Sequence, residues 1–194
     1  MPWQYSLVGL IAVALVAGLE LGQMVADIHS NKFKARGPVL LEWLLLLQWP
    51  FALTYIHYQA GTGVMALVVF SIFLSDVCAF FGGKKFGRHK LAVKISAGKT
   101  WEGVGFGLVG GVAVAFLAWQ IFAVDIAALS LLAFAVAMVL AGIIGDLNES
   151  WIKRLAGIKD SSTLLRDHGG MLDRIDSLLS ASLLVAVLVF YKVI

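Results

Sequence analysis

The stretch I-A-A-L-S-L-L-A-F-A-V-A-M-V-L-A-G-I-I-G, residues Ile126–Gly145, contains no charged side chain. A helix of about 20 apolar residues is long enough to cross the hydrocarbon core of a bilayer. The whole chain shares this character, since 60% of its 194 residues are hydrophobic, 14% are charged and the mean hydropathy is +0.91. The bilayer core has no water to satisfy backbone groups, and the alternating pattern of barrel strands is missing. Spanning helices and an all-α fold are therefore predicted.

Five further windows are similarly apolar, which predicts six spans within a single domain. These windows are Ser6–Val25, Val39–Tyr58, Gly61–Phe81, Val104–Val124 and Ser177–Ile194. Three long polar loops alternate with two short connections along the chain. The long loops are Ala26–Pro38, Gly82–Gly103 and Asp146–Asp176. With six spans, this alternation places the long loops on one side of the membrane and both chain ends on the other.

The positive charge indicates which side this is. Every lysine and arginine except Lys192 lies in one of the three long loops. Because cytoplasmic loops are enriched in these residues, we expect an integral protein of the bacterial inner membrane with the long loops facing the cytoplasm. Basic loops also attract anionic headgroups of membrane lipids, so their charge alone identifies no substrate. No nucleic-acid partner is expected.

Two aspartates mark the ends of the third long loop. Asp146 directly follows the fifth apolar window, and Asp173 comes just before the sixth. If these helices pack as antiparallel neighbours, the two carboxylates would face each other at the membrane surface. Apposed carboxylates repel unless a cation or proton lies between them, and carboxylate oxygens are ligands that suit Mg²⁺. The sequence therefore predicts a metal site at Asp146 and Asp173.

Basic and hydroxyl side chains follow the first of these aspartates at helical spacing. If the helix continues beyond the membrane, Ser150, Lys153 and Arg154 lie along the same flank as Asp146. Lysine and arginine at these positions would neutralise phosphate oxygens. The alternative is that the charges only solvate a loop and form surface ion pairs, each worth roughly 0–1 kcal/mol.

A His-Gly-Gly turn precedes the second aspartate. The glycines of His168-Gly169-Gly170 allow a sharp turn and a close approach to a ligand, with backbone amides available to phosphate. Asp173 and Asp176 then share one helix face at a spacing of three residues. The alternative interpretation is that His168 only caps the turn.

The second long loop adds an acid inside an apolar window. Asp76 lies within or near the end of the third span, where an ionisable side chain is costly and suggests a functional site. The alternative interpretation is that Asp76 is a structural acid, buried and hydrogen-bonded to a neighbouring helix. Gly82-Gly83 would allow a turn after this span. At the start of the fourth span, Lys99 is predicted to hold phosphate at the helix N-terminus, with Glu102 as a cap. The alternative for this pair is an interfacial anchor beside an aromatic belt.

These residues resemble a known signature. The pattern Ser150-x₂-Lys153-Arg154-x₄-Lys159-Asp160-x₇-His168-Gly169-Gly170-x₂-Asp173-Arg174-x-Asp176 is similar to that of the phosphatidate cytidylyltransferases, also called CDP-diglyceride synthetases. The preceding G-D-L-N-E-S at 145–150 and the K-T-W-E-G at 99–103 also resemble this family. The likeness extends from Ser75 onward, and the chain resembles a short member.

The resemblance implies that CTP and phosphatidate react to give CDP-diacylglycerol and pyrophosphate, assisted by Mg²⁺ and by K⁺. It implies that Asp146 and Asp173 bind the metal. Catalytic roles are then expected for Lys153, Arg154, Lys159, Asp160, His168, Arg174 and Asp176. Substrate-binding roles are expected for Asp76, Lys99, Glu102, Ser150, Gly169 and Gly170.

Two local departures leave the lipid substrate open. Arg166-Asp167 stands where the family usually has a Pro-Gly-like pair, and Ala97-Gly98 replaces its usual Pro-rich segment. The alternatives are a CTP-dependent enzyme for an archaeol-type or polyprenyl phosphate, a transporter or channel, and a membrane scaffold without activity. The glycine-rich segment Gly103–Gly111 would permit close helix packing within one chain or in a homodimer. Glu20 and Glu42 are interpreted as interfacial polar residues.

Overall fold

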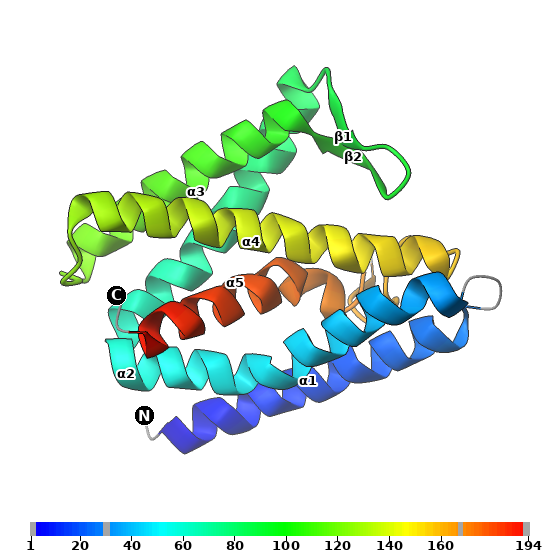
Figure 1. The fold of residues 1–194 in the computed structure, drawn as a ribbon, viewed down its shortest axis with the longest axis horizontal. Helices are drawn as coiled ribbons and strands as arrows, with labels where there is room; N and C mark the ends of the chain where they lie inside the picture. The colour runs from blue at the N-terminus through cyan, green and yellow to red at the C-terminus, as the bar shows by residue number, and fades with distance from the viewer. Residues whose placement is uncertain (1–2, 29–31, 167–168, 192–194) are drawn as a thin grey trace.

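The computed structural model describes residues 3–28, 32–166 and 169–191, with side chains from residue 6 in the first range and from residue 35 in the second. These residues form five helices and one hairpin (Figure 1). The elements in chain order are α1 (Trp3–Ala26), α2 (Lys32–Phe86), β1 (Lys90–Ala92), β2 (Ser96–Thr100), α3 (Trp101–Ile121), α4 (Ala128–Leu155) and α5 (Leu172–Phe190). The predominantly helical prediction is confirmed.

The long helix α2 is interrupted at one glycine. Gly61 has φ 83° and ψ 174°, a conformation that lies outside the helical region and that glycine adopts without a Cβ penalty. The break falls between the second and third apolar windows of the sequence, and in Figure 1 the second part of α2 runs in a new direction alongside α3. One continuous element thus contains two helical segments.

Four of the described helices are long and apolar enough to cross a membrane. They comprise Ser6–Ala26, Ala35–Phe86, Trp101–Ile121 and Ala128–Leu155. Their outer faces present large apolar side chains, such as Leu19, Val109 and Leu129, each at least 70% exposed. An apolar surface of this extent is suited to lipid, so the chain is an integral membrane protein. The predicted window Ser177–Ile194 overlaps α5, which ends at Phe190 and whose first turns also carry charged residues.

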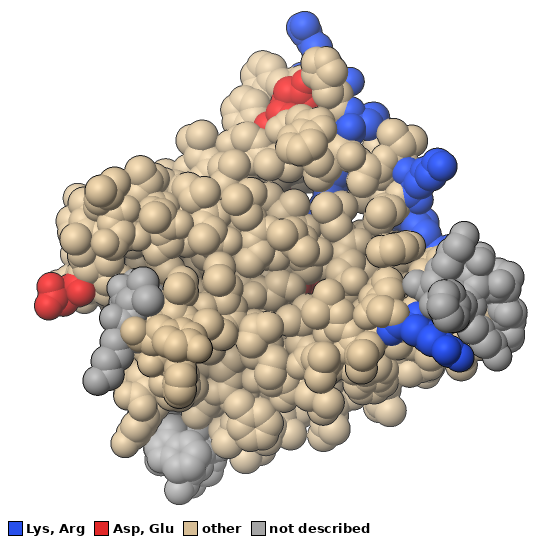
Figure 2. Space-filling view, viewed as in Figure 1, with Lys and Arg blue, Asp and Glu red and all other residues tan. Residues whose placement is uncertain are grey.

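The long connections gather at one end of the molecule. In Figure 1 both chain termini lie at the opposite end from the hairpin and the α4–α5 connection. Figure 2 shows lysine and arginine side chains on the visible face concentrated at the end that carries the hairpin, while most of the remaining surface is uncharged. The second and third polar loops therefore lie at the same end of the described structure, as the sequence predicted, whereas part of the first lies outside the described residues.

The hairpin corrects the all-α prediction. β1 and β2 are antiparallel, with Lys90 opposite Thr100, and the turn closes by a hydrogen bond from the Ile95 amide to the Ala92 carbonyl. Strands of three and five residues are too short for an alternating pattern to be recognised in the sequence. The predicted turn at Gly82-Gly83 is also wrong, because α2 continues to Phe86. These glycines instead bring α2 close to α3: a Cβ on Gly82 would lie 2.3 Å from the Phe106 ring.

The glycine-rich face of α3 packs within the chain. A Cβ on Gly107 would lie 3.1 Å from the Ser75 carbonyl oxygen, and one on Gly110 would lie 2.5 Å from Cys78 Sγ. A Cβ on Gly111 would lie 2.6 Å from Val139 on α4. The close packing predicted from this segment is confirmed inside one chain, and it positions α3 and the hairpin against α2 and α4.

We expect Gly107→Leu to lower the free energy of unfolding by about 1–3 kcal/mol, because the added side chain must displace α2. Gly105→Leu is the matched control, since it changes the same helix at a position with nothing within 4 Å of the added Cβ. Denaturant unfolding of both variants in detergent measures the difference. Equal stabilities of the two variants would contradict this account of the α2–α3 contact.

Candidate functional site

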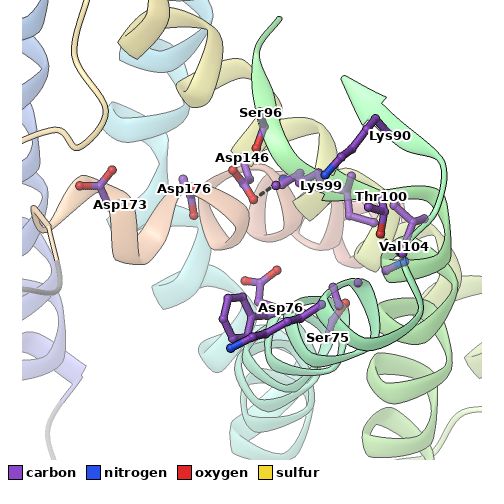
Figure 3. Close-up of a pocket in the computed structure, with 18 of the residues that line it drawn as sticks. Ser75, Asp76, Lys90, Ser96, Lys99, Thr100, Val104, Asp146, Asp173 and Asp176 are labelled. Carbon is purple, nitrogen blue, oxygen red and sulfur yellow. Dashed lines mark hydrogen bonds and ion pairs between the residues drawn. The ribbon is translucent and has the colours of Figure 1, made fainter. Parts of the chain in front are cut away.

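A cavity of about 740 Å³ lies between the second part of α2, the hairpin and the adjoining ends of α3, α4 and α5 (Figure 3). Charged side chains from all these elements except α3 line it. They are Asp76, Lys84, Lys90, Lys99, Asp146, Lys153, Asp160, Asp173, Arg174 and Asp176. One part of the wall is apolar and includes Ala79, Phe80, Val104 and Ile143. The cavity thus combines a strongly charged lining with an apolar flank.

The first aspartate of the third loop is held by a lysine of the second loop. α4 continues to Leu155, as expected, so Asp146 lies on a helix and not in a loop. Lys99 Nζ forms an ion pair with Asp146 Oδ2 (Figure 3), and Ser150 Oγ donates to Asp146 Oδ1 at 3.2 Å. Two segments separated by more than 40 residues in the sequence therefore meet at this carboxylate.

Lys153 joins α4 to α5. Its Nζ lies 2.8 Å from Glu149 Oε2 on the same helix and 2.5 Å from Asp173 Oδ1 on α5. The Glu149 side chain is completely buried and the other two are about 9% exposed. Buried charges need partners of opposite sign, and removing one partner leaves an uncompensated buried charge. This bridge therefore fixes the separation of the two helices at the cavity.

The second oxygen of Asp173 is held by the α4–α5 connection. Asp173 Oδ2 accepts hydrogen bonds from Gly170 N at 2.7 Å, Ser161 N at 2.9 Å and Ser161 Oγ at 2.8 Å. Burial acts to raise the pKa of Asp173, but the hydrogen bond and charge of Lys153 and these backbone donors outweigh it, so the pKa falls below its ordinary value. Asp173 is therefore ionised at neutral pH.

Asp176 behaves in the opposite way. Its side chain is buried one turn further along α5. Burial, followed by the negative charges of Asp146 and Glu149, raises the pKa of Asp176 well above its ordinary value. The two aspartates of α5 thus have different electrostatic roles, although the sequence spacing places them on one face.

Thr100 and Glu102 fix the two ends of the hairpin. Thr100 is the N-cap of α3, and its hydroxyl accepts from Gly103 N at 3.1 Å. Glu102 accepts from the backbone amides of Arg88 and His89 at 3.1 to 3.3 Å and lies 2.6 Å from His89 Nδ1. Glu102 therefore holds the chain that enters β1, and it does not line the cavity.

The structure separates the predicted site residues into two groups. Those that line the cavity are Asp76, Lys99, Asp146, Lys153, Asp160, Asp173, Arg174 and Asp176. Those that lie outside its lining are Glu102, Ser150, Arg154, Lys159, Gly169 and Gly170. Arg154 donates to the carbonyls of Ile95 at 3.0 Å and Ile158 at 2.8 Å, which connects α4 to the hairpin turn. His168 lies outside the described residues.

Several residues that lie around the cavity without lining it were missed in the sequence. Glu20 and Glu42 were interpreted as interfacial polar residues, and this is wrong, because they are only 5% and 1% exposed. Glu42 Oε2 accepts from Asn148 Nδ2 at 2.6 Å, whereas Glu20 contacts the α4–α5 connection. The available signal was a single acidic residue inside an apolar window, the same signal that identified Asp76. Ser161 carried no such signal.

The donor atoms around the cavity fit a hard cation. Among the described residues, no three His, Cys, Asp or Glu side chains are placed to hold a metal ion together. Mg²⁺ usually takes only one or two carboxylates from the protein and completes its shell with water and substrate phosphates. Asp146 and Asp173 supply the right oxygens, but each is paired with a lysine and they do not share a partner. The metal site remains a prediction.

The chain is similar to proteins of known function. The model of the cytidylyltransferase family matches residues 2–192. A phosphatidate cytidylyltransferase of Pseudomonas aeruginosa is 42% identical over 139 residues, which cover 71% of this chain and 48% of that protein. The phosphatidate cytidylyltransferase of Haemophilus influenzae is 36% identical over 178 residues, which cover 84% of this chain and 62% of that protein. That of Mycobacterium leprae is 31% identical over 201 residues, which cover 94% of this chain and 64% of that protein. The chain therefore spans about half to two thirds of the length of these relatives.

A pair of glycines tests the packing around Asp173. Gly169 and Gly157 both have φ +76°, but a Cβ on Gly169 would lie 2.7 Å from Asp173 Oδ2, whereas nothing lies within 4 Å at Gly157. Both Gly→Ala variants should lose about 1–2 kcal/mol from the left-handed backbone. We expect Gly169→Ala to lose clearly more, because Asp173 must move. Denaturant unfolding compares them, and equal losses would show that Asp173 accommodates the methyl group.

Proposed function

The chain belongs to the cytidylyltransferase family, and on this premise we propose that it transfers the cytidylyl group of CTP to phosphatidate. The products are CDP-diacylglycerol and pyrophosphate, and the pathway served is phospholipid biosynthesis. Named relatives that match most of this chain are phosphatidate cytidylyltransferases, which supports this choice. The chain spans only 62% and 64% of the length of those two proteins, so its activity requires a direct test.

One observation carries the proposal: the three segments that resemble the family's signature meet in a single cavity. Lys99 of K-T-W-E-G pairs with Asp146 of G-D-L-N-E-S, and Lys153 and Asp173 of the long signature line the same space. A volume of about 740 Å³ suits a ligand of nucleotide size. The charged lining fits a triphosphate, and the apolar flank fits the part of a phospholipid next to its headgroup.

In the proposed reaction, an oxygen of the lipid phosphate attacks the α-phosphorus of CTP and pyrophosphate leaves. No nucleophile from the protein is required. Such transfers depend on positioning and on neutralising the charge that accumulates in the transition state. The lysines at the cavity are suited to this role because each can bind phosphate oxygens as a point charge. Arg174 also lines the cavity and would bind phosphate through its forked guanidinium group.

We propose that Asp146 and Asp173 hold Mg²⁺, with K⁺ as a second cation. The bound Mg²⁺ would neutralise the phosphates and orient them for in-line displacement. Lys99 and Lys153 now pair with these two carboxylates. They would exchange these partners for phosphate oxygens when the cation and CTP enter. Arg154 and Glu102, which lie outside the cavity lining, would act by holding the hairpin.

The proposed setting is a bacterial inner membrane with the cavity facing the cytoplasm. The two parts of α2 together with α1, α3, α4 and α5 would supply six spans. The concentration of basic residues at the cavity end supports this orientation through the positive-inside rule. The arrangement suits the substrates, because CTP is dissolved in the cytoplasm whereas phosphatidate stays in the bilayer.

The decisive experiment incubates the purified protein with radiolabelled CTP, Mg²⁺ and a panel of lipid phosphates in detergent micelles. Phosphatidate should yield a labelled CDP-lipid with one pyrophosphate released per product. Product formed only from an archaeol-type or polyprenyl phosphate would keep the reaction and change the substrate. The absence of any CDP-lipid, with ion flux in liposomes, would replace the enzyme by a transporter.

We expect Asp146→Asn and Asp173→Asn each to lower turnover by roughly 10²-fold, the loss that follows removal of one electrostatic stabiliser of a transition state. EDTA should abolish turnover and added Mg²⁺ should restore it. Asp125→Asn is the control, because it removes the same charge from an exposed position in the α3–α4 connection. Full metal-dependent turnover in either of the first two variants would refute the metal assignment.

A further inference from the structure

A buried acid on α1 reaches the α4–α5 connection. Glu20 is the only charged residue of α1, and only 5% of it is exposed. An ionisable side chain in an apolar helix is costly unless its partners compensate for the lost water. Its contacts lie more than 140 positions further along the sequence, in the α4–α5 connection and next to the start of α5. The partners of Glu20 therefore connect the first helix of the chain to the candidate site.

The Glu20 carboxylate caps α5. Glu20 Oε1 accepts from Ser162 Oγ at 2.6 Å and from Met171 N at 3.0 Å. Glu20 Oε2 accepts from Leu172 N at 2.8 Å. The N-cap residue of α5, Met171, makes no side-chain cap of its own. The first amides of a helix need acceptors, and here a carboxylate from a distant helix supplies them where the helix dipole also favours negative charge.

The same cluster contains Asp173. Ser161 Oγ lies 3.2 Å from Glu20 Oε2 and 2.8 Å from Asp173 Oδ2, so one hydroxyl connects the two acids. Gly170, whose amide donates to Asp173, has no room for a side chain: its Cβ would lie 2.7 Å from both Glu20 oxygens. The Glu20 carboxylate therefore packs directly against the backbone that holds Asp173.

We propose that Glu20 is a positioning residue, which fixes the N-terminus of α5 and thereby the orientation of Asp173. The inference rests on the proposed function, because Asp173 matters there as a metal ligand. It also explains why an acid occupies this position. An ionised carboxylate offers acceptors on both oxygens, whereas the isosteric amide of glutamine would direct its own N–H groups at one pair of donors. Those donors would lose their partner in a buried place.

The test compares Glu20→Gln with wild type in two measurements. Hydrogen–deuterium exchange of the peptide that contains Met171 and Leu172 should become about tenfold faster, because these amides lose their cap. The Mg²⁺ concentration for half-maximal turnover should rise about tenfold, a loss typical of removing a partner that orients a metal ligand. Asp27→Asn is the matched control, since it removes an exposed acid just after α1 and should leave both values unchanged.

A purely structural role for Glu20 would lower the amount of folded enzyme and leave the half-maximal Mg²⁺ concentration as in wild type, which would overturn the proposal. Unchanged exchange at Met171 and Leu172 would overturn it too. If Glu20→Gln does not fold, Ser162→Ala removes one donor to Glu20 and should shift both values less, in the same direction; no shift would again overturn it. If wild-type protein forms no CDP-lipid, the proposed function fails, and exchange alone decides the role of Glu20.

Discussion

The ion bridge from Lys153 to Glu149 and Asp173 is the interaction on which the rest of the site depends. Glu149 has no exposed surface, so no solvent stabilises its carboxyl group, and Lys153 Nζ is the partner that replaces the lost water. The same lysine ends at Asp173 on α5. One cation therefore satisfies two carboxylates on different helices. This arrangement adds little stability compared with an apolar contact, but it connects α4 directly to α5 beside the cavity.

The bridge between α4 and α5 has consequences on both sides of the cavity. Asp146, one turn before Glu149 on α4, comes within reach of Lys99, and this pair brings the hairpin over the cavity. The glycines of α3 allow the close approach to α2 that makes the contact possible. On the other side, Asp173 holds the α4–α5 connection through Ser161 and Gly170, and Glu20 holds the same connection from α1. The charged residues thus hold the hairpin and the α4–α5 connection in place, in addition to surrounding the cavity.

The sequence predicted the features that depend on composition and short spacing. Apolar windows located the helices, and the extension of α4 placed Asp146, Ser150 and Lys153 on one flank. It did not predict the features that depend on contacts between distant segments. Lys99 was assigned to phosphate and pairs with Asp146, and Glu20 was assigned to the interface and caps α5. An acid's environment depends on what packs against it, and neither hydropathy nor spacing contains that information.

The pairing of each proposed metal ligand with a lysine is consistent with a site that exchanges partners during turnover. A cavity lined by five aspartates and no cations would repel CTP, whereas this one is also lined by four lysines and one arginine and so presents little net charge. Two of these lysines already pair with aspartates. In the proposed reaction, a nucleotide that arrives with Mg²⁺ would supply both signs at once, so the carboxylates would gain a cation as the lysines gain phosphate oxygens. Each charge would then keep an opposite partner before and after this exchange. Burial raises the pKa of Asp176 and so favours its uncharged form, which reduces the repulsion beside Asp146.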